Sequence, residues 1–205
     1  MGVALDDWAD PAANTGIAAD GRSVLVRPVR ADDGPLIDAF VKDLSPQSRQ
    51  RRFHAPIKEL PPAWLDRLTH PHDGFELGLL AVATHAGRET CIGEARYALG
   101  DETPGDREFA LAVADAWQGA GIGARLLRRL SRHAECCGVA HLYGDVLRDN
   151  APMIGLARRL GYEVRRHPVE ARLLRVVKTL NHALPASAAL PCGRAVGSRI
   201  VAVGA

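Results

Sequence analysis

The chain has 205 residues, enough for one ordinary domain with a sizeable core. Its 47% hydrophobic and 24% charged residues are typical of a soluble globular protein. Lys and Arg number 26 against 24 Asp and Glu, and the net charge of +2 does not indicate nucleic acid or an anionic membrane as a partner. The start "MGVALDDWADPAANTG" lacks the basic and apolar regions of a secretory signal, and no apolar run approaches the roughly 18 residues of a membrane span.

The cysteine and histidine residues give no sign of a metal site or a disulfide framework. Four cysteines occur, without any Cys-x-x-Cys spacing: Cys91, Cys136, Cys137 and Cys192. His70 and His72 form a His-x-His pair that lacks a third ligand. We therefore expect reduced structural thiols, no metal, and a cytoplasmic protein.

The first elements in chain order are a leader, a strand and a divided helix. Residues 1–21 are rich in Ala, Asp and Gly and lack periodicity, so we expect a flexible leader. "SVLVRPVR" (23–30) alternates apolar and other residues, as a strand does. Residues 31–52 have a helical pattern that breaks near Ser45-Pro46, and "LPPAWLDRLTH" (60–70) predicts a short helix opened by prolines.

Three strands and a long helix follow. The strand patterns occupy residues 75–85, 91–99 and 108–115, with short turns between them. From Gly123 the period changes to that of a helix, which Gly138 ends. The apolar stripe of this helix contains Leu126, Leu127, Leu130, Ala134 and Cys137.

The last elements predict a strand, a helix and a hairpin. "HLYGDVL" (141–147) has a strand pattern, and "DNAPMIGLARRLGY" (149–162) predicts a helix with an Asn or Asp cap and Gly161 just past its end. Residues 162–180 complete the sheet as a hairpin. Residues 183–205 contain no acid and much Ala, Gly and Pro, so we expect a flexible tail. Docking of "RIVAV" as a terminal strand is the alternative.

The stretch "AWQGAGIGARLL" (116–127) places a glycine-rich loop directly before the long helix. Such a loop presents unpaired N–H groups and the positive end of the helix dipole to an anion. A Walker A loop is excluded, because Ala124 and Arg125 follow the last glycine where that motif needs Lys and then Ser or Thr.

A dinucleotide-binding fingerprint, G-x-G-x-x-A, fits Gly119, Gly121 and Ala124, with Asp145 in the next strand as a ribose-binding acid. In that fold the first glycine ends the strand directly, whereas residues 115–118 intervene here. The preceding strands are also joined by short turns, as in an antiparallel meander rather than a βαβ unit. Both differences disfavour the fingerprint.

The third motif is Q-x-x-G-x-G, formed by Gln118, Gly121 and Gly123. With this motif, the order of elements over residues 23–180 and the later "DN…LARRLGY", the chain resembles the GNAT superfamily of acyl-CoA-dependent N-acyltransferases. Within it, "EFALAVADAWQGAGIGARLLRRL", "LYGDVLRDNAPMIGLARRLGY" and "LSPQSRQRRF" are most similar to the bacterial protein lysine acetyltransferases that act on acyl-CoA synthetases.

The resemblance implies a fold and a co-substrate. The fold is a single α/β domain over residues 22–182, with a mixed, largely antiparallel central sheet splayed near its middle, around Val113, and helices on both faces. The co-substrate is acetyl-CoA, held by the loop, by the strand before it and by Asn150, for which a plain helix cap is the alternative. The implied cofactor-binding residues are Val113, Gln118, Gly119, Ala120, Gly121, Ile122, Gly123, Ala124 and Asn150.

The resemblance also implies the chemistry. Glu108 stands at the start of the strand before the loop, where family members often carry the general base; a strand-edge carboxylate in an acidic turn is the alternative. A backbone N–H around Val113 is the expected donor to the thioester oxygen. Ala157 occupies the position at which many small-molecule members carry a Tyr as general acid, so no acid is assigned.

We therefore expect transfer of an acetyl group from acetyl-CoA to a primary amine, namely a lysine of a protein such as an acyl-CoA synthetase. The alternatives are a small-molecule amine acetyltransferase and a non-catalytic acyl-CoA-binding module. The segment "LSPQSRQRRFHAPIKELPPAWLDRL" lies where family members build their substrate-side helices. Its basic residues either meet an acidic partner surface or form a solvated helix face: Arg49, Arg51, Arg52 and Lys58.

Overall fold

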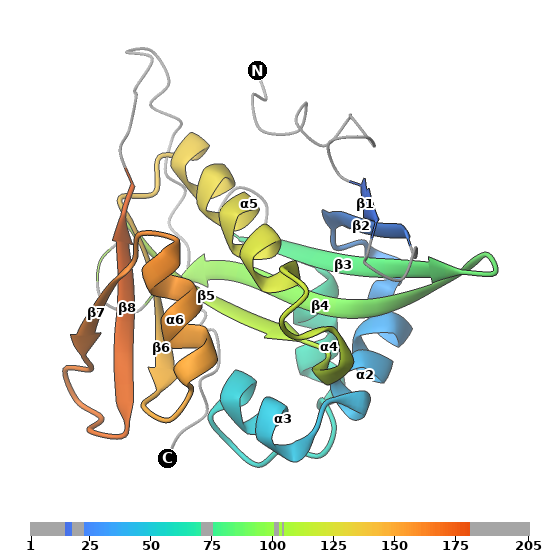
Figure 1. The fold of residues 1–205 in the computed structure, drawn as a ribbon, viewed down its shortest axis with the longest axis horizontal. Helices are drawn as coiled ribbons and strands as arrows, with labels where there is room; N and C mark the ends of the chain where they lie inside the picture. The colour runs from blue at the N-terminus through green and yellow to red at the C-terminus, as the bar shows by residue number, and fades with distance from the viewer. Residues whose placement is uncertain (1–14, 18–22, 71–75, 101–102, 104, 181–205) are drawn as a thin grey trace.

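A mixed eight-stranded sheet, in the order β1-β2-β3-β4-β5-β6-β8-β7, forms the centre of the molecule (Figure 1). The computed structural model describes residues 15–17, 23–70, 76–100, 103 and 105–180. The strands are β1 Thr15–Ile17, β2 Ser23–Pro28, β3 Leu77–His85, β4 Arg88–Leu99, β5 Asp106–Val113, β6 His141–Leu147, β7 Glu163–Arg166 and β8 Leu173–Thr179. All neighbouring strands are antiparallel except β5 and β6, which are parallel.

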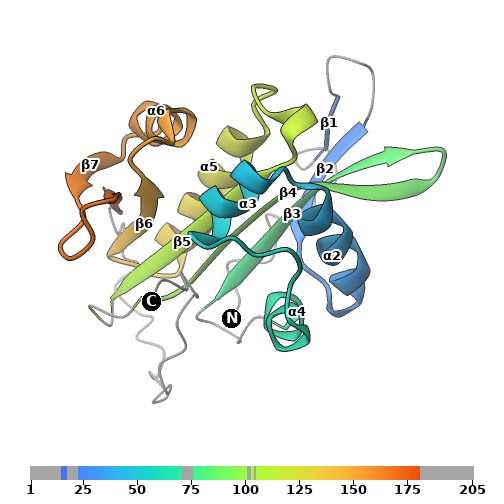
Figure 2. The same ribbon diagram turned by 90° about the horizontal axis from the view of Figure 1, so that it is seen from below.

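Helices cover both faces of the sheet, as the GNAT resemblance implied (Figures 1 and 2). They are α2 Gly34–Asp43, α3 Pro46–Phe53, α4 Pro62–Thr69, α5 Ile122–Cys136 and α6 Ala151–Arg159, with short 3-10 turns at Ala31–Asp33 and Asp115–Trp117. One buried cluster joins α5 and α6 to the sheet, and a second joins α2 and the end of α3 to the opposite face. The division of the first helical region at Pro46 is confirmed.

The long helix α5 follows from its apolar stripe. Leu126, Leu127 and Leu130 are completely buried against the sheet, and each contributes about 1.5–3 kcal/mol relative to an exposed side chain. The predicted end is confirmed, because Gly138 has φ +75° and the N–H of the following residue bonds back to Ala134. The expectation that Cys137 continues the stripe is wrong: this residue follows the last helical turn and is exposed.

The parallel pairing of β5 with β6 is short. It joins Asp106 to His141, Arg107 to Leu142 and Glu108 to Tyr143, and the two strands separate beyond it (Figure 2). The separation therefore begins directly after Glu108, and Val113 lies well inside the open part. The ring of Phe109 fills the start of the gap, where it lies so close to Gly144 that a Cβ there would be 2.9 Å from the ring.

One described part of the terminal segments differs from the sequence-based expectation. Within the expected leader, residues 15–17 form β1 and pair with β2, so that part of the leader has regular structure. The expected tail, residues 183–205, lies outside the described residues. None of the helices in the described ranges is long and apolar enough to cross a bilayer.

The thiols and histidines of the described residues form no metal site: no group of three His, Cys, Asp or Glu side chains is suitably placed there. Cys91 is buried and Cys136 is exposed, and both are free thiols. Cys192 and His72, which also entered the sequence-based expectation, lie outside the described residues.

Candidate active site

A cleft of about 380 Å³ opens where β5 and β6 separate, between α3 on one side and the first turns of α5 and α6 on the other. Most of the residues expected at a cofactor or catalytic site line it: Glu108, Val113, Gln118, Gly119, Gly121, Gly123, Ala124 and Asn150. Ala120 and Ile122 do not. Ile122 is buried in the core against the sheet, and Ala120 is exposed. If these two residues contribute to cofactor binding, they do so through their backbone N–H groups and not through their side chains.

Two of the loop glycines have conformations that other residues rarely adopt. Gly119 has φ +79° and Gly121, the N-cap residue of α5, has φ +83°. A Cβ at either position would meet nothing within 4 Å, so both face open space at the cleft. The first intrahelical bond of α5 runs from Arg125 N–H to Gly121 O, which leaves the N–H groups of residues 122–124 without an intrahelical acceptor.

Gly123 has a different role, which is close packing. A Cβ at this position would lie 3.3 Å from Leu156 and 3.6 Å from Val113. The absence of a side chain therefore lets α5 approach both α6 and the end of β5. In the glycine motif, Gly119 and Gly121 thus face open space at the cleft, whereas Gly123 allows close packing of α5.

The end of β5 presents backbone groups to the open side. Ala114 N–H bonds to Ile92 O of β4 at 2.9 Å. Because successive residues of a strand turn their amides to opposite neighbours, the N–H of Val113 faces away from β4, toward the gap. The carbonyl of Val113 accepts a 3.2 Å hydrogen bond from Gln118 Nε2.

Asn150 caps α6 and also lines the cleft. Its Oδ1 accepts a 3.3 Å hydrogen bond from Met153 N–H, and the residue is 8% exposed. The cap uses only the oxygen of the amide, and the Nδ2 group has no partner among the described residues. The two sequence-based roles of Asn150, cap and cofactor contact, are therefore compatible.

Glu108 is half-buried and lines the cleft at the point where the strands separate. Phe109, Leu111 and Val113 pack with the α5 cluster, as expected from strand alternation. Ala112 packs with the α2 cluster, so Glu108 points to the face that α3 covers. The carboxylate is thus directed to the side of the sheet opposite to the glycine loop helix.

A second carboxylate on the same face, Glu94 of β4, is held by two arginines. Its Oε2 accepts from Arg52 Nε at 3.2 Å and Nη2 at 3.1 Å, and its Oε1 accepts from Arg96 Nε at 2.8 Å. Burial raises the pKa of Glu94, but the charges and hydrogen bonds of the two arginines outweigh this and hold the pKa below its usual range. A carboxylate so held is not available as a proton acceptor.

The start of α3 is tied to the cofactor side of the cleft through Asp115. Its Oδ1 accepts from Ser45 Oγ at 2.9 Å and from Ser48 Oγ at 2.7 Å, and its Oδ2 accepts from Ser45 N–H at 2.9 Å. Gln118 Nε2 donates to Ser48 Oγ at 3.2 Å, in addition to its bond with β5. We refer to Ser45, Ser48, Asp115 and Gln118 as the α3 clasp.

Replacing Asp115 with Asn should lower the free energy of unfolding by about 1–2 kcal/mol at pH 7, because the partly exposed donors at the start of α3 lose a charged acceptor. Partial burial raises the pKa of Asp115, but the hydrogen bonds from Ser45 and Ser48 outweigh it and hold the pKa below its usual range. The stabilisation is therefore present above the unfolded-state pKa of about 3.9 and is lost as the pH falls through the lower folded-state value.

Urea unfolding of both proteins at a series of pH values measures this difference. Asp38→Asn is the matched control, since Asp38 only pairs with Lys42 on the surface of α2 and should change stability by less than about 1 kcal/mol. Equal losses in the two variants, or a loss from Asp115→Asn that does not shrink at low pH, would contradict the clasp.

Two further residues of the cleft are His54, which no sequence motif marks, and Asp145, which the dinucleotide alternative assigned to a ribose. His54 ends α3 with φ 55° and lines the cleft, where burial lowers its pKa although the charge of Asp145 acts in the opposite direction. Asp145 accepts from Arg175 Nε at 2.8 Å and is 3.1 Å from His167 Nε2. Asp145 therefore anchors the β7–β8 hairpin rather than binding a ribose.

Ala157, the position for which the resemblance implied a tyrosine acid in many small-molecule members, is a core residue. Ala157 is completely buried, and Tyr162 uses its hydroxyl within the core, 2.9 Å from Ser131 Oγ. Burial raises the pKa of Tyr162 well above its usual range. No tyrosine hydroxyl lines the cleft among the described residues.

The expected basic docking surface is only partly at the surface. Arg52 is 9% exposed and engaged with Glu94. Arg49 donates at 2.9 Å to the carbonyl of Lys42 at the end of α2. Of the four residues, Lys58 is exposed and Arg51 lines the cleft, so the set does not form one docking face.

The cleft has the features that acetyl-CoA requires. The open glycines and the unpaired N–H groups at the start of α5 are suited to a pyrophosphate. Leu111, Val113 and Leu156 form an apolar wall along which an extended arm can lie. The antiparallel arrangement of β3, β4 and β5 also excludes the dinucleotide-binding fold.

Comparisons with known proteins agree with this fit. The acetyltransferase PA5475 of Pseudomonas aeruginosa is 36% identical over 149 residues, which cover 73% of this chain and 80% of that protein. An L-methionine sulfoximine/L-methionine sulfone acetyltransferase of the same species is 35% identical over 107 residues, 50% of this chain and 58% of that protein.

Solved structures show the same fold. The GNAT domain of S. lividans PAT has a TM-score of 0.71 and 29% identity, covering 81% of this chain and 96% of that domain. The structure of yncA from Salmonella typhimurium, solved with acetyl-CoA, has a TM-score of 0.62 and 20% identity over 80% of this chain and 99% of that one.

The sequence profile of the Acetyltransferase (GNAT) family matches residues 38–162. The chain therefore belongs to the GNAT family of acetyltransferases, enzymes that take their acetyl group from acetyl-CoA.

Proposed function

We propose that this enzyme acetylates a lysine side chain of a protein, with Glu108 as the general base. A lysine amine of pKa about 10.4 is mostly protonated at pH 7, and freeing it costs about 4.6 kcal/mol. The observation that carries the proposal is the position of Glu108, which lines the cleft on the α3 side at the point where β5 and β6 part. A carboxylate there can take the proton directly or through one water.

The other groups of the cleft support this reaction. The amine nitrogen attacks the thioester carbon, the C–S bond breaks, and the sulfur leaves with the electron pair. The N–H of Val113, which faces the gap, is the proposed donor to the oxygen that gains negative charge. No side chain is assigned as the acid, since a thiolate of pKa about 8.5 can leave as the anion.

Two observations bear on the acceptor. The resemblance of the glycine-loop and "GLARRLGY" stretches to the protein lysine acetyltransferases favours a protein lysine. The likeness to an acetyltransferase named for L-methionine sulfoximine and L-methionine sulfone favours a second candidate, a small amine. That relative is matched over 58% of its length, so the protein acceptor remains the first proposal.

The acceptor is tested by comparing a folded acyl-CoA synthetase with a short peptide that carries its target lysine. We expect kcat/KM to be at least about tenfold higher for the folded protein, because contacts remote from the amine add to transition-state binding. Intact-mass measurement with an amine panel serves as the control. A free amine that reacts faster than both would establish the small-molecule candidate instead.

A further inference from the structure

Two adjacent arginines of α3 line the cleft in different surroundings. Arg52 is buried and its guanidinium is engaged by Glu94. Arg51 is half-buried, and it has no hydrogen bond or ion pair with any described residue. Its Nε atom is buried without a partner. Arg51 is therefore a charged donor that the protein itself leaves unsatisfied inside a cleft.

The surrounding charges strengthen the case for an anion at this place. Glu94 carries one negative charge against the two positive charges of Arg52 and Arg96, so that buried group has a surplus positive charge. Ser48, one turn before Arg51, is neutral and is used by the α3 clasp. No carboxylate on α3 is available to neutralise Arg51, because the helix contains none.

The opposite wall of the cleft carries carboxylates. Glu108 lines it on β5 and Asp145 lines it on β6, and Asp145 is held by Arg175. Because Asp145 and Arg52 are each paired within the protein, the cleft presents the guanidinium of Arg51 on the α3 wall and the carboxylate of Glu108 on the strand wall to the ligand. A molecule with an ammonium group and a nearby carboxylate matches both walls, whereas an isolated cation matches only one.

We infer that Arg51 binds a carboxylate of the acceptor close to the amine that is acetylated. A planar guanidinium can hold a carboxylate through two parallel hydrogen bonds, which also fixes the orientation of the amine toward Glu108. The inference rests on the proposed acetyl transfer to an amine. The carboxylate belongs either to an acidic side chain beside the target lysine of a protein or to a free amino acid.

The test uses two pairs of acceptors that differ in one carboxylate. The first pair is a capped peptide with the sequence Ala-Ala-Lys-Asp-Ala and its Lys-Asn counterpart; the second is free lysine and lysinamide. The parent enzyme should favour the carboxylate member of one pair by about tenfold in kcat/KM. In Arg51→Gln that preference should fall to about one. Arg51→Lys should keep part of it, since the charge remains while the bidentate geometry is lost.

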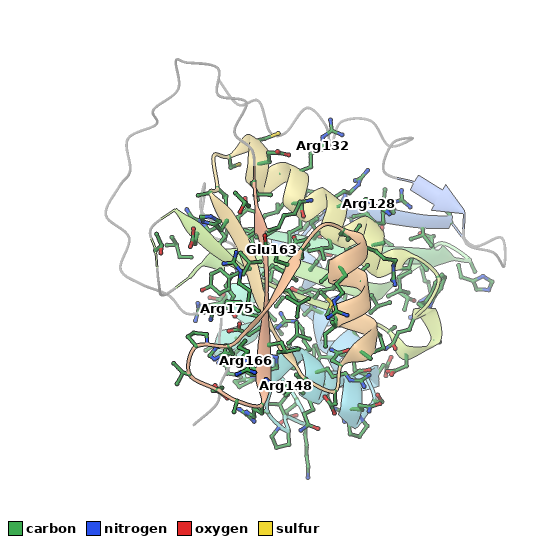
Figure 3. All side chains as sticks on the ribbon, turned by 60° about the vertical axis from the view of Figure 1, so that its left-hand side comes forward. Arg128, Arg132, Arg148, Glu163, Arg166 and Arg175 are labelled. Atoms are coloured by element: carbon green, nitrogen blue, oxygen red, sulfur yellow. The ribbon has the colours of Figure 1, made fainter. Side chains whose placement is uncertain are left out.

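Arg128→Gln is the matched control. It removes one positive charge from the outer side of α5, outside the residues that line the cleft, and should leave the preference intact (Figure 3). A preference confined to the peptides identifies an acidic neighbour in a protein, and one confined to free lysine identifies an amino acid. Calorimetry should give the same acetyl-CoA Kd for Arg51→Gln as for the parent.

Three results would overturn the inference. The first is acetylation of both pairs without a carboxylate preference, and the second is a preference that survives in Arg51→Gln. The third is a loss of acetyl-CoA affinity in that variant, which would make Arg51 a ligand of the cofactor phosphates. Acetylation of none of the four acceptors would contradict the proposed lysine acetylation as well.

Discussion

Glu108→Gln should slow acetyl transfer by at least about 10²-fold at pH 7, in line with general-base contributions. The substitution removes the proton acceptor and keeps the size and shape of a side chain that lines the cleft. Acetyl-CoA affinity should barely change, because the glycine loop and the end of β5 are untouched. Steady-state rates at saturating amine and calorimetric titration of acetyl-CoA measure the two quantities separately.

The matched control is Glu163→Gln, which removes an exposed carboxylate from β7, where it pairs with Arg165 (Figure 3). This variant should retain the parent rate. Turnover of Glu108→Gln equal to that of the parent would show that Glu108 is a strand-edge carboxylate, and the base would have to be another group of the cleft.

Gly121→Val should weaken acetyl-CoA binding by at least about 100-fold, equivalent to about 2.7 kcal/mol. Gly121 is the N-cap of α5, and its φ of +83° is a backbone conformation that a β-branched residue resists. A valine there would either twist the loop or place its methyl groups in the open space that a pyrophosphate needs. Calorimetry measures the affinity, and circular dichroism measures whether the fold is retained.

Gly87→Val separates backbone strain from the loss of a binding surface. Gly87 has φ +75° in the β3–β4 turn, and a Cβ there would also meet nothing within 4 Å. It does not line the cleft. Both variants should lose similar stability, and Gly121→Val alone should lose affinity. Parent-like binding by folded Gly121→Val would show that the loop does not hold the cofactor.

Local sequence patterns were sufficient for most of the fold. The stripe of Leu126, Leu127 and Leu130 predicts α5 and its buried face, because helix period and burial are local properties. The turns between β3, β4 and β5 are short, so their antiparallel pairing also follows from the sequence. The separation of β5 and β6 depends on packing between segments far apart; the resemblance implied it around Val113, and the structure shows that it begins directly after Glu108.

The contacts that the sequence could not reveal join distant segments. The hydrogen bond from Ser45 to Asp115 spans 70 residues, and that from Arg52 to Glu94 spans 42. Neither pair has a spacing or motif that marks it. The run of basic residues in α3 predicts an exposed face, although the fold turns Arg52 inward. The proposed binding of a carboxylate by Arg51 likewise depends on the position of α3 at the cleft, which the sequence does not reveal.

The α3 clasp has a consequence for the order and cooperativity of binding. It fixes Ser45 and Ser48, at the start of the helix that forms the acceptor wall, to the residues that precede the glycine loop. If acetyl-CoA orders the glycine loop, the clasp also orders the start of α3. Because such coupling is reciprocal, a bound acceptor must raise the affinity for the acetyl donor by the same factor by which the donor raises the affinity for the acceptor.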